Sequence, residues 1–306
     1  MCRQCEIHPV YELTNRRKFC EKCFCRFFEK KVFSTIRRYK MFSARDKVAV
    51  ACSGGKDSMV VLHILHKIAK KARKKITALA VEEGTGQRKK LLKKLEKYCK
   101  DSKIQLKIIS FKKEYGFELQ AILPKIKSLK LTNCYVCSIL KRWLLNKKAR
   151  EMGITKIATG HSLDDEAETV IINMMKGNPA LLAKLGPVSG IKQRKKLVQR
   201  IKPLYFRSSK EVILYAKFQK LPLSLKTCTL RTDTFRASIR NFLENMEKNH
   251  PEIKNAIVNS LLQILPLLKE KHKDIELMSC KKCKEASSAE LCKRCMVLEM
   301  LKSIKK

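Results

Sequence analysis

The sequence predicts an α/β protein built on a parallel sheet, with a helical extension and a small cysteine-rich unit at each end. Three observations lead to this prediction. Short apolar runs alternate with amphipathic runs between residues 48 and 204. Five of the 14 cysteines precede residue 26, and four more follow residue 279. The 306 residues, 44% of them hydrophobic, are enough for about two domains with a sizeable core, which excludes wholesale disorder.

The predicted elements follow in order along the chain. Five strands are predicted, at 48–52, 76–81, 105–109, 156–159 and 201–204. Six helices are predicted, at 59–65, 88–100, 138–150, 211–220, 233–248 and 251–269. Little core-forming periodicity is expected before residue 40. We therefore expect four parts: an N-terminal unit at 1–39, a central domain at 40–207, a helical extension at 208–278 and a C-terminal unit with a basic tail at 279–306.

The charge balance favours a nucleic-acid partner. Lys and Arg number 69 against 28 Asp and Glu, which gives a formal net charge of +41. A lysine-rich, thermophile-like surface is the alternative, but glutamate normally rises with lysine on such surfaces. The basic segment 176–200 is predicted to be a loop, and its cations are Lys192, Arg194, Lys195, Lys196 and Arg200. RNA or DNA is therefore the expected anion.

No apolar run approaches the roughly 18 residues that a membrane-spanning helix needs. The residues Met1-Cys2-Arg3-Gln4 open no signal-peptide pattern. We therefore expect a cytoplasmic protein without a membrane partner.

A phosphate-binding loop is predicted after the first strand. Ser53-Gly54-Gly55-Lys56-Asp57-Ser58 connects that strand to a helix. Glycines let a ligand approach the backbone, and the N–H groups of a helix N-terminus bind anions. A glycine turn with a capping serine is the simpler interpretation. The whole hexapeptide at the carboxyl end of a parallel strand favours a nucleotide site instead.

The hexapeptide SGGKDS resembles the signature of the PP-loop ATP pyrophosphatases, and residues 159–166 (TGHSLDDE) match a second motif of that superfamily. The resemblance implies a Rossmann-like, adenine nucleotide α-hydrolase-like fold that binds ATP at the carboxyl edge of its sheet. It also implies adenylation of a carbonyl oxygen with release of pyrophosphate. The implied ATP-binding residues are Ala51, Ser53, Gly54, Gly55, Lys56, Asp57, Ser58, Val81, Lys141, Gly160 and Asp165.

Three internal cysteines form a second candidate site. Cys134 and Cys137 make a C-x2-C pair just before a predicted helix, and Cys228 stands alone further along the chain. Small buried residues with an unrelated thiol are one interpretation, and a dithiol redox pair is another. A metal site is the third, because C-x2-C brings two thiolates to one ion or cluster. Three thiolates without a fourth partner suit an iron–sulfur cluster with one open iron.

The C-x2-C pair followed by Lys141-Arg142, with one distant cysteine, resembles the TtuA/TtcA-type tRNA 2-thiolation enzymes. The resemblance implies that Cys134, Cys137 and Cys228 hold a 4Fe–4S cluster, with 3Fe–4S left open. It implies that Lys141 and Asp165 are catalytic, with Lys56 neutralising phosphate charge and Asp164 as the alternative to Asp165. A carboxylate there suits Mg²⁺. A solvated helix lysine is the plainer interpretation of Lys141.

The terminal cysteines are spaced as zinc ligands. Each end carries two C-x2-C pairs around a short loop, which gives four thiolates in tetrahedral reach and no open position. The expected zinc ligands are Cys2, Cys5, Cys20 and Cys23 at one end and Cys280, Cys283, Cys292 and Cys295 at the other. His8 and Cys25 are expected not to bind metal. Two zinc ribbons are typical of the TtuA-type group rather than the TtcA branch.

The expected function is 2-thiolation of a tRNA uridine. ATP adenylates the C2 oxygen, pyrophosphate leaves, and sulfur then displaces AMP. Lysidine-type amidation is one alternative, which needs no cysteines. A cluster-free persulfide enzyme and a non-catalytic zinc-ribbon RNA-binding protein are two others. The expected cofactors are ATP, Mg²⁺, the iron–sulfur cluster and two Zn²⁺. The expected partners are tRNA, a second copy of the chain, and a sulfur donor that is either a ubiquitin-like thiocarboxylate carrier protein or sulfide.

Overall fold

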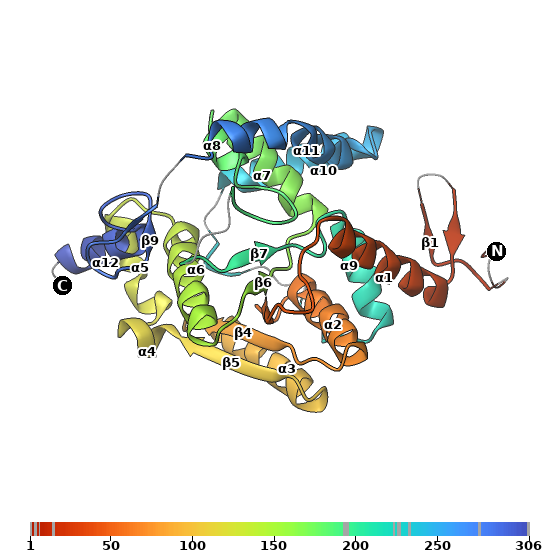
Figure 1. Ribbon diagram of the computed structural model, residues 1–306, viewed down its shortest axis with the longest axis horizontal. Coiled ribbons are helices and arrows are strands. Elements are labelled where there is room, and N and C mark those ends of the chain that lie inside the picture. Colours follow the sequence, from red (N-terminus) through yellow and green to blue (C-terminus); the bar gives the residue numbers. More distant parts are fainter. Residues whose placement is uncertain are drawn as a thin grey trace.

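The computed structural model describes residues 2–304 apart from 3–4, 6, 14–15, 192–195, 223, 225–227, 232–233 and 275–276. Its centre is a five-stranded sheet in which every strand pairs in parallel, in the order β5-β4-β3-β6-β7 (Figure 1). The strands are β3 (Val48–Ala51), β4 (Thr77–Glu82), β5 (Gln105–Ser110), β6 (Lys156–Ala158) and β7 (Gln199–Ile201). The predicted α/β class and all five predicted strands are confirmed, although β7 begins two residues earlier than expected.

The strand order creates a crevice. The chain runs outward from β3 through β4 to β5, and then returns to β6 on the other side of β3. The direction in which the chain moves across the sheet therefore reverses between β3 and β6, and doubly wound sheets bind ligands at the carboxyl ends of the strands at such a point. The phosphate loop follows β3, and the motif at 159–166 follows β6.

The longest helices of the central region are α2 (Lys56–Lys71), α3 (Gly86–Asp101), α6 (Asn133–Glu151) and α7 (Leu163–Met175). Three short helices lie between α3 and α6, at α4 (Phe111–Tyr115), η1 (Leu119–Ile122) and α5 (Leu123–Ser128), and α8 (Pro179–Leu182) follows α7. Helix α6 begins five residues before the predicted start, because the Thr132 side chain caps it by accepting from the Tyr135 N–H. The C-x2-C pair therefore lies within the first two turns of α6, which corrects the expectation that it precedes the helix.

The two ends of the chain have the same local architecture. Each has a two-stranded antiparallel hairpin followed by a helix, and the second C-x2-C of each begins at the residue before that helix. The elements are β1 (Tyr11–Glu12), β2 (Lys18–Phe19) and α1 (Glu21–Arg38), then β8 (Met278–Ser279), β9 (Ala286–Ser287) and α12 (Lys293–Ser303). The two units lie at opposite ends of the molecule (Figure 1).

Helix α1 overturns the expectation that residues before 40 contribute little to a core. Phe24, Phe28 and Val32 are fully buried. Phe28 stacks on Tyr215 of α9 (Ser209–Phe218), with ring centroids 4.5 Å apart. Helices α1, α2 and α9 share one hydrophobic cluster. These contacts cross the expected boundaries at 39/40 and 207/208, and the four-part division stays a prediction.

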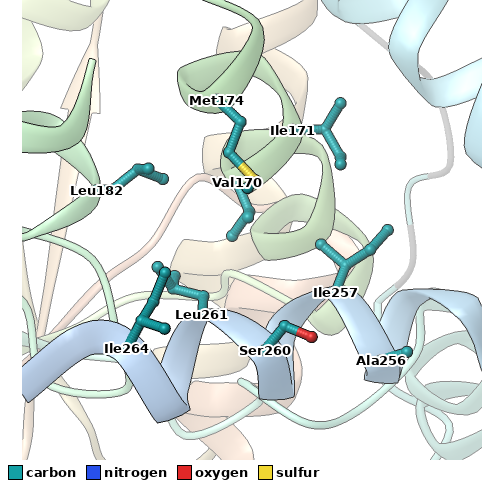
Figure 2. A pocket seen from close by; sticks show the side chains of 9 residues that line it. All are labelled: Val170, Ile171, Met174, Leu182, Ala256, Ile257, Ser260, Leu261 and Ile264. Atoms are coloured by element: carbon teal, nitrogen blue, oxygen red, sulfur yellow. The ribbon is translucent and has the colours of Figure 1, made fainter. Parts of the chain in front are cut away.

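Two further helices cover α7. They are α10 (Thr234–Asn249) and α11 (Ile253–Lys271), and both pack against it. Helices α7 and α11 leave an apolar hollow of about 310 Å³, into which Val170, Met174, Leu261 and Ile264 point (Figure 2). Within the described residues, no helix is both long and apolar enough to cross a bilayer.

Candidate nucleotide and metal sites

The phosphate loop is folded by its own hydrogen bonds. The Ser53 N–H donates to Ser58 Oγ at 3.1 Å, and that hydroxyl donates to the Gly55 carbonyl at 2.9 Å. Gly54 has a φ of +75°, and a Cβ there would lie 3.0 Å from the backbone oxygen of Leu91. Both the left-handed backbone and the close packing therefore require glycine. The N–H groups that follow open helix α2.

The second motif packs directly onto this loop. A Cβ at Gly160 would lie 2.7 Å from the backbone nitrogen of Ser58, so glycine lets the two loops touch. His161 Nδ1 lies 2.8 Å from Thr159 Oγ1. Burial, which disfavours the charged imidazolium, and the nearby Lys202 ammonium lower the pKa of His161 to about 4. The imidazole is therefore neutral at physiological pH.

A cavity of about 350 Å³ opens between the phosphate loop, α6 and the ends of β3, β4 and β6. Seven predicted ATP-binding residues line it: Ala51, Ser53, Asp57, Ser58, Val81, Lys141 and Gly160. Four others do not: Gly54, Gly55, Lys56 and Asp165. Ten lining residues were not predicted: Cys52, Leu79, Arg88, Ser138, Arg142, Leu145, Ile157, Thr159, His161 and Arg200.

Lys56 does not line this cavity but contacts a residue that does. Its ammonium donates to Asp57 Oδ1 at 2.7 Å and to Ser209 Oγ, at the start of α9, at 3.2 Å. Burial raises the pKa of Asp57, although the Lys56 ammonium opposes this shift. In this arrangement Lys56 joins the phosphate loop to α9, and its predicted role at the phosphates stays a prediction.

Lys141 belongs to a buried ion-pair group. Its Nζ lies 2.9 Å from Oε1 of Glu83, and Arg88 Nε lies 2.9 Å from the same carboxylate. Burial favours the neutral acid, but the two cations together hold the pKa of Glu83 below its usual range. Arg88 also donates to the Ser53 carbonyl. Glu83 therefore connects α6 to the phosphate loop.

The two aspartates of the second motif have different partners. Asp165 completes a capping box on α7, since its Oδ2 accepts from the Ser162 N–H at 3.0 Å. Asp164 accepts from Lys254 Nζ at 2.7 Å and from the Ser209 N–H at 2.6 Å. Both carboxylates are thus used within the protein, and the catalytic role of Asp165 stays a prediction.

The internal cysteines are brought toward one another. Cys134 and Cys137 lie on successive turns at the start of α6. The Asn133 amide donates to the Leu230 carbonyl at 3.3 Å, which ties this helix end to the segment after Cys228. The three thiols do not form a group within 4.8 Å, the spacing found for single-ion sites in the described chain. A cluster places its ligands further apart than one ion does.

The four cysteines at each end of the chain lie close together, as their C-x2-C spacing predicts. Two groups have all their sulfur atoms within 4.8 Å of one another, Cys2 with Cys5, Cys20 and Cys23, and Cys280 with Cys283, Cys292 and Cys295. Such spacing fits one tetrahedral ion in each group. Cys25 lies outside the first group and accepts a hydrogen bond from the Gln219 amide at 3.3 Å.

The C-terminal cysteine group is docked against α6. The Arg294 guanidinium lies 4.2 Å from the centroid of a Trp143 ring. Glu285 pairs with Arg150 and accepts from the Asn146 amide at 3.4 Å. The helix that carries Cys134, Cys137 and Lys141 is therefore supported by this unit.

Comparisons with known proteins agree with this geometry. The family model of the PP-loop domain matches residues 27–247. The cytoplasmic tRNA 2-thiolation protein 1 of Anopheles gambiae is 32% identical over 287 residues, which cover 92% of this chain and 82% of that protein. Its Drosophila melanogaster counterpart is 33% identical over 285 residues, with the same shares covered.

A solved structure is similar over the whole chain. The U34-tRNA thiolase NcsA from Methanococcus maripaludis, solved with its 4Fe–4S cluster, gives a TM-score of 0.83 at 30% identity, over 100% of this chain and 96% of that one. The chain therefore belongs to the PP-loop family and, within it, to the group of the cytoplasmic tRNA 2-thiolation proteins.

Proposed function

We propose that the chain is an ATP-dependent tRNA sulfurtransferase that replaces the C2 oxygen of a tRNA uridine with sulfur. One observation carries this proposal. Ser138 and Lys141 of α6 line the same cavity as Ser53 and Ser58 of the phosphate loop. Since Ser138 directly follows Cys137, the helix of the thiol pair reaches the nucleotide site.

In the first step the uridine C2 oxygen attacks the α-phosphate of ATP. An O–P bond forms, the bond between the α- and β-phosphates breaks, and pyrophosphate leaves. The N–H groups at the start of α2 and the Lys141 ammonium are suited to neutralise the charge that develops on the phosphates. We propose Asp165 as the carboxylate that positions Mg²⁺ there, with Asp164 as the alternative, and Lys56 as a further phosphate-neutralising cation.

In the second step sulfur attacks C2, and AMP leaves with the C2 oxygen. An iron–sulfur cluster supplies that sulfur when it is bound. The donor set fits such a group, because Cys134 and Cys137 share the first turns of α6 and the Asn133–Leu230 hydrogen bond draws the Cys228 segment to the same helix end. We propose these three cysteines as its ligands. We propose the two terminal thiol groups as structural zinc sites.

Three finer assignments complete the proposal. The name of the archaeal neighbour supports uridine 34 as the target. The names of the insect relatives support a cytoplasmic location. A homodimer is proposed, and the sulfur donor is a ubiquitin-like thiocarboxylate carrier protein or sulfide.

The test uses the full chain purified without oxygen and incubated with a tRNA transcript, ATP and sulfide. Retardation in a mercury-containing gel measures thiolated tRNA, and chromatography measures AMP and pyrophosphate. We expect thiolated tRNA, with about three to four iron atoms per chain. Cys134→Ser and Cys228→Ser should lose both iron and thiolation. Cys99→Ala, which removes a buried thiol of α3 outside the cavity lining, is the matched control.

Full thiolation by Cys134→Ser would refute the role of the cluster. Thiolation by wild-type protein that contains no iron would favour the persulfide alternative. Tight tRNA binding without ATP and without pyrophosphate release would favour the non-catalytic RNA-binding alternative.

A further inference from the structure

We infer that Arg142 and Arg200 form a second phosphate-binding subsite in the nucleotide cavity, which takes a backbone phosphate of the tRNA. The inference rests on the proposed function, since it names the part of the tRNA that the cavity would hold. Both arginines line the cavity, Arg142 from α6 and Arg200 from β7.

Arg142 and Arg200 differ from the neighbouring cations because, among the described residues, no carboxylate forms an ion pair with them. Lys141 and Arg88 share the Glu83 carboxylate, and Lys202 pairs with Glu166 at 2.7 Å. By contrast, no carboxylate of the described residues lies within the 4.0 Å of a salt bridge from Arg142 or Arg200. Arg200 instead donates to the backbone carbonyl of Arg142 at 3.4 Å. Uncompensated cations that line the same cavity favour an anion beside them.

The lowered pKa values of the two arginines also favour a bound anion. Burial and the neighbouring Arg142 guanidinium lower the pKa of Arg200 to about 10. Desolvation by neighbouring atoms and the Arg236 guanidinium lower the pKa of Arg142, although this residue is exposed at the surface of the cavity. Each shift reflects a cation that lacks a counter-charge, and a bound phosphate would reverse it.

The position of the pair favours tRNA over ATP as the source of that phosphate. The ATP phosphates have their own cradle in the loop after β3. Arg200 lies on the edge strand β7, and β6 separates it from β3. The sequence just before β7 is also basic, with Lys192, Arg194 and Lys195. Those three residues lie outside the described part of the chain. A polyanion that approaches from the β7 edge of the sheet would meet Arg200 before the phosphate loop.

The side chains suit a phosphodiester. A guanidinium offers two parallel N–H groups to one phosphate, and its charge persists at any physiological pH. Two such groups from different elements fix both the place and the orientation of the backbone.

The test compares Arg200→Gln, Arg142→Gln and Arg200→Lys with wild-type protein. Fluorescence anisotropy measures binding of a tRNA transcript at several salt concentrations, and equilibrium dialysis measures ATP binding. For each glutamine variant we expect tRNA affinity to fall about tenfold and the slope of log K against log salt to decrease by about one. ATP affinity should stay within about twofold. Arg200→Lys should restore the salt slope and only part of the affinity.

Arg37→Gln is the control for charge alone, because it removes one exposed cation from the last turn of α1. Its tRNA affinity should change less than about twofold. Unfolding temperature and zinc content verify that each variant folds. A loss of ATP affinity in the glutamine variants would assign the pair to the nucleotide and overturn the inference, as would unchanged tRNA affinity. Wild-type protein that binds tRNA through this pair but forms no thiouridine would instead refute the proposed function.

Discussion

Nζ of Lys141 lies 2.9 Å from Oε1 of Glu83, and this contact joins the helix of the C-x2-C pair to the strand-end loop beside the nucleotide cavity. The Glu83 side chain is only 3% exposed, and Arg88 contacts it from a third element, α3. One carboxylate thus neutralises two cations of the cavity. Because the three groups come from separate elements, their contacts hold those elements in a fixed arrangement.

Replacing Glu83 by glutamine is therefore expected to destabilise the fold. The change keeps the shape but leaves Lys141 and Arg88 without a counter-charge, and removing one partner of a buried pair costs about 3 kcal/mol. Urea unfolding measures the effect. Glu114→Gln, which breaks the more exposed pair with Lys147, should cost less than about 1 kcal/mol. Equal costs for the two variants would contradict this interpretation.

The same carboxylate predicts a pH dependence. The pKa of Glu83 in the folded chain is below its ordinary value of 4.5. Its stabilisation is therefore fully present above pH 4.5 and is lost as the pH falls through the lower, folded value. The difference in unfolding free energy between wild type and Glu83→Gln should shrink below pH 4.5. A difference that stays constant or grows in acid would show that Glu83 is not ionised in the fold.

Lys141 should matter for chemistry more than for binding. We expect Lys141→Gln to lower the rate of pyrophosphate release by about 10²-fold, because it removes a cation at the developing phosphate charge. Iron content and tRNA affinity should remain close to wild type. Lys147→Gln, on the same helix and paired with Glu114, should leave the rate unchanged. If both variants lose activity equally, a general effect on α6 explains the loss.

The strands were predictable because buried parallel strands are nearly continuous apolar runs, and β4 is buried along most of its length. Helix α1 was missed although Phe24, Phe28, Val32 and Ile36 follow helical spacing, because the cysteines beside them indicated a loop-rich unit. The two terminal thiol groups were predictable because each pair of cysteines is close in sequence. Cys228 lies 91 positions after Cys137, and its place beside that cysteine stays a prediction. The pairing of Glu83 with Lys141, 58 positions apart in the sequence, depends on tertiary packing that no local pattern encodes.

Disrupting the C-terminal thiol group should destabilise α6. Arg294 packs on Trp143, and Glu285 pairs with Arg150, so both contacts depend on a folded ribbon. We expect Cys292→Ser to lower bound zinc from about two atoms to about one per chain and to increase amide hydrogen exchange along α6. Cys20→Ser at the other end should remove the same amount of zinc without affecting α6. Unchanged exchange in Cys292→Ser would show that α6 holds its position without the ribbon.

A second buried carboxylate anchors the helix that follows Cys228. Glu168 of α7 accepts from Arg236 at 3.0 Å and from Arg240 Nε at 2.7 Å, both on α10. Glu168→Gln removes the counter-charge of two guanidinium groups, so α10 should exchange its amide hydrogens faster, and iron binding through Cys228 should weaken. Glu96→Gln, which removes an exposed carboxylate from α3, is the control. Faster exchange in α10 with undiminished iron would mean that the ion pairs stabilise the helix without positioning the cysteine.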